Sequence, residues 1–176
     1  MNISYNINHL SFAKTNMQDP NYSFLEAKSK LESLCAYQER CQFEINQKLI
    51  SWNFKNEQRD QLISDLISNN FINEQRFAEA FVSGKFRIKK WGRIKIISHL
   101  KQKHISNYSI QKGIKEIDLD EYWETIVKLA SKKKNELEFK KGDIWDKKSK
   151  VFRFLQSKGY ETDITSDAVN EVFTTQ

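Results

Sequence analysis

The sequence predicts an all-α protein made of three tandem three-helix repeats that form an elongated, curved molecule. Two observations support this prediction. The 176 residues include one Pro and five Gly, so long stretches of the chain run without a helix breaker. From Phe24 onward, apolar residues return every three or four positions, which is the period of helices with one buried face.

A helix is expected wherever such an apolar stripe occurs. The stripes are Phe24, Ala27, Leu31, Leu34 and Cys35; Ile45, Leu49 and Trp52; Leu62 and Leu66; Phe77, Ala80, Phe81 and Gly84; Ile97 and Leu100; Ile110, Ile114 and Ile117; Tyr122, Ile126, Leu129 and Ala130; Val151, Phe154 and Leu155; and Ile164, Ala168 and Val172. Residues 93–97 also alternate briefly, as in a strand, but their short length and helical flanks favour a helix.

The tetrapeptide NEQR occurs twice, at 56–59 and 73–76, each time before an amphipathic run. Asn56 and Asn73 can each accept a backbone N–H bond as an N-cap, and the next residue, Glu, then lies at the positive end of the helix dipole. The tetrapeptide therefore predicts two helix starts.

A longer pattern divides the chain into units. In three places a leucine is followed five residues later by another apolar or aromatic residue: Leu49 and Phe54, Leu100 and Ile105, Leu155 and Tyr160. The spacing between these places fits three short helices per unit. We therefore expect repeats at residues 22–71, 72–117 and 118–176, after a flexible N-terminal extension at residues 1–21. Stacked repeats generally present an extended, often concave, face.

Charge is strongly segregated, although the net charge is only +6. Residues 80–115 hold ten basic and no acidic side chains, and residues 116–127 hold five acidic and no basic ones. Surface helices usually mix signs, because opposite charges four residues apart stabilise each other. The basic run therefore favours a polyanionic or acidic partner, and the alternative is a solvated helix face.

The centre of this run reads KFRIKKWGRIKI (85–96), with six cations and the aromatic residues Phe86 and Trp91 among them. Nucleic-acid surfaces combine cations, which contact phosphates, with rings that stack on bases. Trp91 directly precedes Gly92, where one helix is expected to end and the next to begin. This position favours a packing role for the Trp91 ring.

No constellation of residues indicates catalysis. Gly84-Lys85 lacks the upstream glycine of a phosphate-binding loop, and there is no Gly-x-Ser-x-Gly motif. His99 and His104 are five residues apart and would point in different directions on one helix, while Cys35 and Cys41 lack a second cysteine pair. We expect a protein that is not an enzyme and has no metal or cofactor.

The chain has no stretch of about 18 consecutive apolar residues, and no apolar segment typical of a secretory signal follows its start. Two cysteines do not make a disulfide framework, so free thiols are expected. These features predict a cytoplasmic protein without a membrane partner, and a monomer is the default expectation.

The segment NEQRFAEAFVSGKFRIKKWGRIKIISHLKQKHIS (73–106) resembles the central signature of the RecX family of bacterial recombination regulators. The matching residues are Arg76, Phe77, Ala78, Phe81, Lys89, Trp91, Gly92, Arg93, Leu100, Lys103 and Ile105. Segments 36–54 and 154–160 are similar to the family's first-repeat pattern and third-repeat turn, so the resemblance covers roughly residues 24–174. His104 stands where the family has a turn glycine, and a positive φ there would strain the residue.

The resemblance implies three tandem three-helix units and a regulatory function. A protein of this kind binds RecA recombinase filaments on single-stranded DNA and inhibits their extension, ATPase and strand exchange, which modulates recombination and DNA repair. The single-stranded DNA contact is expected to be weak and independent of sequence. The expected RecA- or DNA-binding surface comprises Lys85, Arg87, Lys89, Lys90, Arg93, Lys95, Lys101 and Lys103. The expected packing residues of the motif are Phe77, Ala78, Phe81, Trp91, Gly92 and Leu100.

Two other functions fit the same sequence features. Three-helix units with a basic helix also occur in free-standing DNA-binding proteins of the helix-turn-helix kind. A structural adaptor that uses only the apolar faces of its repeats would not need the basic residues.

Overall fold

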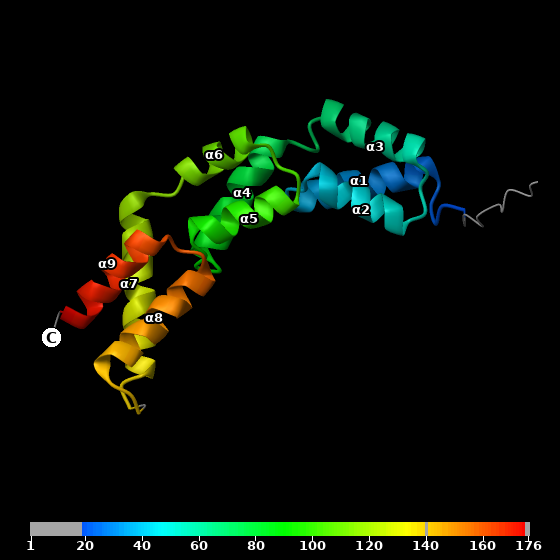
Figure 1. Ribbon diagram of the computed structural model, residues 1–176. Helices are drawn as coiled ribbons and strands as arrows, with labels where there is room; N and C mark the ends of the chain where they lie inside the picture. Colours follow the sequence, from blue (N-terminus) through cyan, green and yellow to red (C-terminus); the bar gives the residue numbers. More distant parts are fainter. Residues whose placement is uncertain (1–18, 140, 175–176) are drawn as a thin grey trace, which may run out of the picture.

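The computed structural model describes residues 19–139 and 141–174, and within these ranges all regular structure is helical (Figure 1). The helices are α1 (Phe24–Tyr37), α2 (Gln42–Ser51), α3 (Asn56–Ser68), α4 (Glu74–Arg87), α5 (Arg93–Gln102), α6 (Asn107–Lys115), α7 (Leu119–Glu136), α8 (Ile144–Lys158) and α9 (Thr162–Thr174). The all-α prediction is confirmed. Most of the predicted N-terminal extension, residues 1–18, lies outside the described residues. Asn21, at its end, donates its N–H to the carbonyl of Trp52 at 3.0 Å.

The helices follow one another in three units, which we call the first (α1–α3), middle (α4–α6) and third (α7–α9) units. Together they form an elongated arc, as predicted (Figure 1). The second helix of each unit (α2, α5, α8) lies on the inner side of the arc, and the third helix (α3, α6, α9) lies on the outer side. The inner side therefore presents one helix from each unit in succession.

Two hydrophobic cores hold these units together. The first unit has a core of its own, built around Leu31, Ile45 and Leu62. A second core is continuous through the middle and third units, from Phe77 to Val172, and it also includes Cys41. The middle and third units therefore share buried side chains, whereas the start of α2 is the part of the first unit that reaches into their core.

The same turn joins the second and third helices of every unit. The bonds that close it run from the N–H of Phe54 to the carbonyl of Leu49 (3.1 Å), from Ile105 to Leu100 (3.2 Å) and from Tyr160 to Leu155 (3.3 Å). The residue before each donor has a positive φ: 63° at Asn53, 59° at His104 and 90° at Gly159. Glycine adopts this conformation at no steric cost, whereas a side chain costs about 1–2 kcal/mol. His104 thus carries the strain that the sequence predicted.

Two local predictions need correction. Asn73 caps α4 by accepting the N–H of Arg76, as expected, but α3 is preceded by Lys55 and has no side-chain cap. Asn56 is instead the first residue of α3, and its side-chain oxygen accepts a hydrogen bond from Arg59. The Asn56 side chain therefore pairs with another side chain and does not cap a backbone N–H group.

The buried face of α4 also differs from the predicted one. Its buried residues are Phe77, Ala78, Val82 and Phe86, whereas Ala80 from the predicted stripe is exposed. The reason is α6, which packs so closely on α4 that a Cβ at Gly113 would lie 3.2 Å from the backbone of Ala78. This contact leaves Ala80 exposed and Phe81 half-buried at the edge of the core.

Within the described ranges, every helix is too short or too polar to cross a membrane.

Candidate functional site

The basic segment 85–96 forms the turn between α4 and α5, as the sequence predicted. Helix α4 ends at Arg87, and the N–H groups of Lys90 and Trp91 bond to the carbonyls of Phe86 and Lys85 at 3.0 and 3.1 Å. Gly92 is the N-cap of α5. The turn therefore brings the cations of the last turn of α4 next to those of the first turn of α5.

Three side chains meet around the half-buried ring of Trp91. The ammonium groups of Lys85 and Lys95 lie 5.3 and 5.0 Å from the centre of the ring, and the ring of His99 lies 4.7 Å away. Lys85 is also 5.0 Å from the ring of Phe81. Burial and the ammonium groups of Lys95, Lys85 and Lys103 lower the pKa of His99. We call Lys85, Trp91, Lys95 and His99 the Trp91 cluster.

The Trp91 cluster borders a groove of about 510 Å³ between the middle unit and the start of α2. One wall consists of residues from α4 and its C-terminal end, namely the core residue Phe77 and the more exposed Ala80, Phe81, Gly84 and Ile88. Lys85, Lys89, Trp91, His99 and Lys103 supply the polar and aromatic lining, and Gln38, Glu39 and Glu44 of the first unit complete it. A surface groove with an apolar wall and a cationic rim suits a ligand that is both flat and anionic.

Ion pairs across this groove connect the first and middle units. Arg76 binds Glu39 at 2.5 Å, and Lys103 binds Glu44 at 2.7 Å. The ring of Phe43 lies 5.2 Å from that of His104. Lys103 therefore has a carboxylate partner within the molecule, which reduces the charge it offers to a ligand.

The structure places Arg93 in the joint between the middle and third units. Its guanidinium lies 4.2 Å from the ring of Tyr122 and 3.7 Å from the carboxylate of Glu161, and 21% of its side chain is exposed. The hydroxyl of Tyr122 accepts the N–H of Arg93 at 3.0 Å and donates to Glu161 at 2.6 Å. Burial, with the bond to Glu161, raises the pKa of Tyr122. Arg93 therefore has a structural role at this joint.

The two backbones touch directly at the same joint. The N–H groups of Gly92 and Ile94 bond to the carbonyls of Lys158 and Gly159 at 2.9 and 3.0 Å. A Cβ at Gly92 would lie 2.3 Å from the oxygen of Gly159, so this approach requires glycine. The hydroxyl of Tyr160 also donates to the carbonyl of Lys90 at 3.3 Å. Gly92 is buried at this joint.

The other predicted residues have different surroundings. Lys89 and Lys101 are exposed, and Arg87 is exposed with an ion pair to Glu121 at 3.5 Å. The predicted packing residues Phe77, Ala78 and Leu100 are buried, whereas Phe81 and Trp91 are half-buried and line the groove. The structure thus divides the predicted set into residues that hold the joints and residues that face outward.

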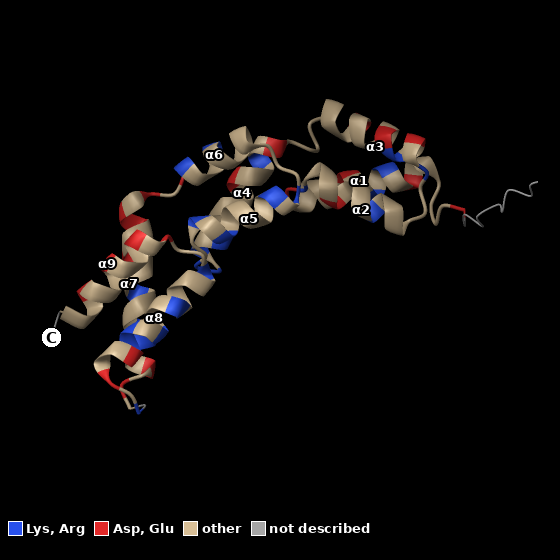
Figure 2. Cartoon of the chain, in the orientation of Figure 1, with Lys and Arg blue, Asp and Glu red and all other residues tan. Residues whose placement is uncertain are grey.

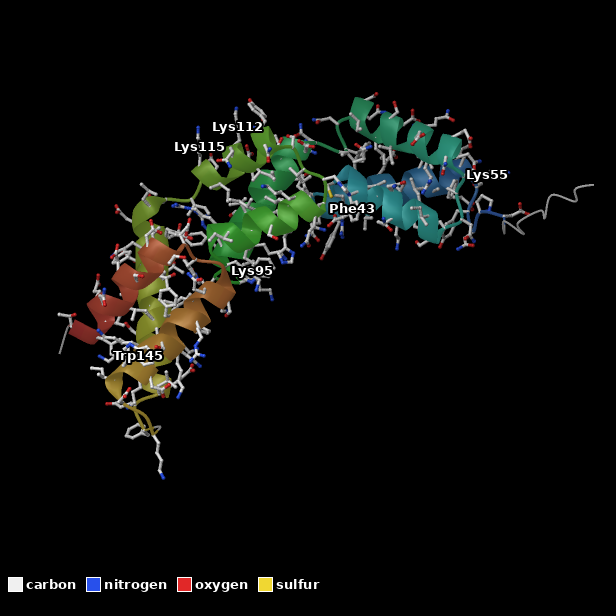
Figure 3. All side chains as sticks on the ribbon, viewed as in Figure 1. Phe43, Lys55, Lys95, Lys112, Lys115 and Trp145 are labelled. Carbon is white, nitrogen blue, oxygen red and sulfur yellow. The ribbon has the colours of Figure 1, made fainter. Side chains whose placement is uncertain are left out.

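The acid-free run does not lie on one face. Lys95 points to the inner side of the arc, whereas Lys112 and Lys115 of the same run lie on the outer side (Figure 3). Further cations occur on α8, so that Lys and Arg positions follow α5 and α8 along the inner side (Figure 2). The fold therefore places part of the acid-free run and the cations of α8 on the same side of the arc.

Sequence reasoning missed His99 as part of this site. The available signal was spacing, because Lys95 and His99 are four residues apart and therefore share a face of α5. Among the described residues no group of His, Cys, Asp and Glu is arranged to hold a metal ion. Both cysteines are free and buried, and burial raises the pKa of their thiols.

Comparison with known proteins places this fold in a family. Models described as the second and third three-helix domains of RecX match residues 73–114 and 120–169. A regulatory protein RecX of Clostridium perfringens is 33% identical over 129 residues, which is 73% of this chain and 60% of that protein. One from Clostridium beijerinckii is 27% identical over 150 residues, which is 85% of this chain and 70% of that protein. The chain spans about 60% of the length of the first clostridial relatives it matches.

Solved structures show the same arrangement of helices. The crystal structure of RecX from Lactobacillus salivarius has a TM-score of 0.74, with 22% identity, and the match covers 86% of this chain and 97% of that one. A second crystal structure of a regulatory protein RecX has a TM-score of 0.72, with 22% identity, and the match covers 87% of this chain and 72% of that one. The two domain models, the sequence relatives and the shared fold agree, and the chain belongs to the RecX family of regulatory proteins.

Proposed function

We propose that this protein binds RecA recombinase filaments on single-stranded DNA and inhibits their extension, ATPase and strand exchange. The observation that carries the proposal is membership of the RecX family, by two of its domain models and its fold. By this regulation the protein modulates homologous recombination and DNA repair. It acts as a cytoplasmic monomer without a cofactor, and its contact with single-stranded DNA is weak and independent of sequence.

The shape and charge of the molecule support this proposal. An arc with one helix of each unit along its inner side can follow a curved or helical surface over a long distance (Figure 1). Cations on α5 and α8 line that side, where they can meet acidic protein surface or DNA phosphate (Figure 2). Lys85 and Lys89 are the natural candidates for such contacts, because both line the groove.

The test compares two double variants with the same change of charge. Lys85→Glu with Lys89→Glu alters the groove, and Lys112→Glu with Lys115→Glu alters the outer side (Figure 3). ATP hydrolysis and strand exchange by the cognate recombinase are measured against the concentration of each protein. We expect the groove variant to need at least about tenfold more protein for inhibition and the outer variant to match the wild type, which corresponds to about 1.4 kcal/mol in binding. A folded wild-type protein without any effect on either reaction would refute the proposal.

A second function is favoured by one observation on the outer side. The third helix of the middle unit, α6, exposes Tyr108, Gln111, Lys112 and Lys115. In helix-turn-helix proteins a helix with such side chains reads the major groove of duplex DNA. A free-standing DNA-binding protein of this kind would bind a particular duplex tightly, and the outer variant would lose that binding. Weak binding without sequence preference, unchanged in the outer variant, would exclude it.

A further inference from the structure

The lysines around Trp91 lack the carboxylate partners that surface lysines of this protein often have. Across residues 19–139 and 141–174, ion pairs join Lys28, Lys103, Lys128, Lys133 and Lys150 to acidic side chains. In the same ranges no carboxylate lies within 4.0 Å of the ammonium groups of Lys85, Lys89 or Lys95. Their positive charge is therefore available to an external anion.

The Trp91 ring holds two of these ammonium groups in place. Lys85 and Lys95 lie 5.3 and 5.0 Å from its centre, within the range of a cation–π interaction. The ammonium group of Lys95 also donates to the carbonyl of Ser157 at 3.1 Å. Because the cations are already positioned, an anion that binds between them does not have to order two flexible side chains first.

His99 adds a group that can gain a charge. It faces the ammonium groups of Lys85 from α4 and of Lys95 and Lys103 from its own helix, and the groove also includes Lys89, Glu39 and Glu44. The two carboxylates are engaged by Arg76 and Lys103 at 2.5 and 2.7 Å. Burial and the three lysines disfavour the imidazolium, so His99 is held mostly neutral near neutral pH.

We propose that the Trp91 cluster binds a backbone phosphate of single-stranded nucleic acid, and that His99 takes up a proton when the phosphate binds. This inference rests on the proposed function, because it gives the single-stranded DNA a definite place on this chain. The phosphate lies between Lys85 and Lys95, and the adjoining base lies on the apolar wall formed by Phe81 and Ile88.

The combination of cations and an apolar wall selects a single strand. Bases of a duplex are stacked and paired inside it, so they cannot lie against a protein wall while their own phosphate is bound. An unpaired base has two free faces, and proteins that bind single strands place such bases on aromatic or apolar side chains beside a basic groove. Half-buried Phe81 and exposed Ile88 provide that surface directly beside Lys85.

Proton uptake follows from the charges. A bound phosphate opposes the repulsion between His99 and the lysines and so raises the pKa of His99. The complex then carries more protons than the free protein, and binding strengthens as the pH falls. His99 has one pKa in the free protein and a higher one in the complex. At a pH below both, each unit of difference between them strengthens binding about tenfold.

The experiment measures binding of a short oligothymidylate to the full chain, without recombinase, by fluorescence anisotropy between about pH 5.5 and pH 8, a range that brackets the ordinary pKa of histidine. Thymine and phosphodiester groups do not titrate in this range. The test variant is His99→Phe, which keeps a ring against Trp91. If the His99→Phe protein does not fold, His99→Gln is used instead. The control is His104→Asn, because asparagine also adopts the positive φ of this position, as Asn53 does in the first unit.

We expect the wild type and His104→Asn to bind several-fold more tightly at the acidic end, because the bound phosphate raises the pKa of His99. The affinity of His99→Phe should not change with pH. Replacing both Lys85 and Lys95 by glutamine should reduce the slope of log affinity against log salt by about 0.7, the value for one phosphate contact of a single strand. Lys112→Gln with Lys115→Gln should leave this slope unchanged.

Three results would overturn the inference. The first is a pH dependence in His99→Phe equal to that of the wild type. The second is the absence of oligothymidylate binding. The third is equally pH-dependent binding of an oligoglutamate peptide, which would assign the cluster to protein carboxylates. Each of these results leaves the recombinase assay to decide the proposed function, because no recombinase is present here.

Discussion

Replacing Gly92 by alanine should destabilise the protein by about 2–4 kcal/mol, whereas Gly84→Ala should stabilise it by roughly 0.5–1 kcal/mol. A Cβ at Gly92 would lie 2.3 Å from the oxygen of Gly159 and 2.5 Å from the backbone nitrogen of Tyr160. A Cβ at Gly84 would have no atom within 4 Å, apart from neighbouring residues and the backbone of its own helix. The two substitutions are chemically identical and differ only in what the new methyl group meets.

The magnitude at Gly92 follows from these contacts. Its φ of −77° is accessible to alanine, so the cost does not come from the backbone conformation of this residue. The methyl group meets backbone atoms, which cannot rotate away as a side chain would, so the two turns must separate. Separation weakens the bonds of Gly92 to Lys158 and of Ile94 to Gly159, at a cost of about 0.5 kcal/mol each. It also adds about 1–3 kcal/mol of packing strain. At Gly84, alanine improves helix propensity alone.

Urea unfolding followed by circular dichroism measures both effects. Relative to the wild type, the midpoint should fall for Gly92→Ala and rise for Gly84→Ala, with similar slopes. The middle and third units share one core, so the loss at Gly92 should appear in the main transition. A Gly92→Ala protein at least as stable as the wild type would show that the two turns do not touch, and the assignment of this joint would be wrong.

Arg93→Glu should lower the stability by about 2 kcal/mol, because it places a carboxylate beside Glu161 in a partly buried pair, and thermal unfolding measures the loss. An unchanged melting temperature would contradict this role. For Glu74, burial raises the pKa of the carboxyl, but hydrogen bonds from Ser106 and Ser109 at 2.5 and 2.8 Å outweigh it and lower the pKa overall. Its contribution to stability is therefore present above the unfolded pKa of about 4.3 and is lost as the pH falls through the folded pKa. Glu74→Gln should show a smaller loss of stability on acidification, and an identical pH profile would contradict this.

The helices and their turns were predictable because they depend on local signals. An apolar residue at every third or fourth position predicts a helix wherever the pattern persists. A leucine followed five residues later by an apolar residue marks a turn that is closed by a backbone hydrogen bond between these two residues. The start of α5 was also visible, since Gly92 follows a tryptophan between two amphipathic runs. In each case the sequence positions involved lie within one or two helical turns of one another.

The sequence did not predict which cations lack a carboxylate partner, because the partners lie far away along the chain. Arg93 and Lys103 belong to the same acid-free run as Lys85, yet their carboxylate partners, Glu161 and Glu44, are 68 and 59 residues away. The buried face of α4 could not be predicted for a similar reason. The stripe containing Phe81 has the same period as the buried face, and only contact with α6 decides which of them forms the core. The remaining stripe is then left to form the wall of the groove.

The position of this groove connects ligand binding to the arrangement of the units. One side belongs to the middle unit, which shares a core with the third, and the other side carries Glu39 and Glu44 of the first unit. Ion pairs with Arg76 and Lys103 form much of that connection, and pairs of this partly exposed kind contribute modestly to stability. An anion near Lys103 competes with Glu44 for the same ammonium group. Occupation of the groove should therefore weaken the contact between the first and middle units, while the joint at Gly92 keeps the other two fixed.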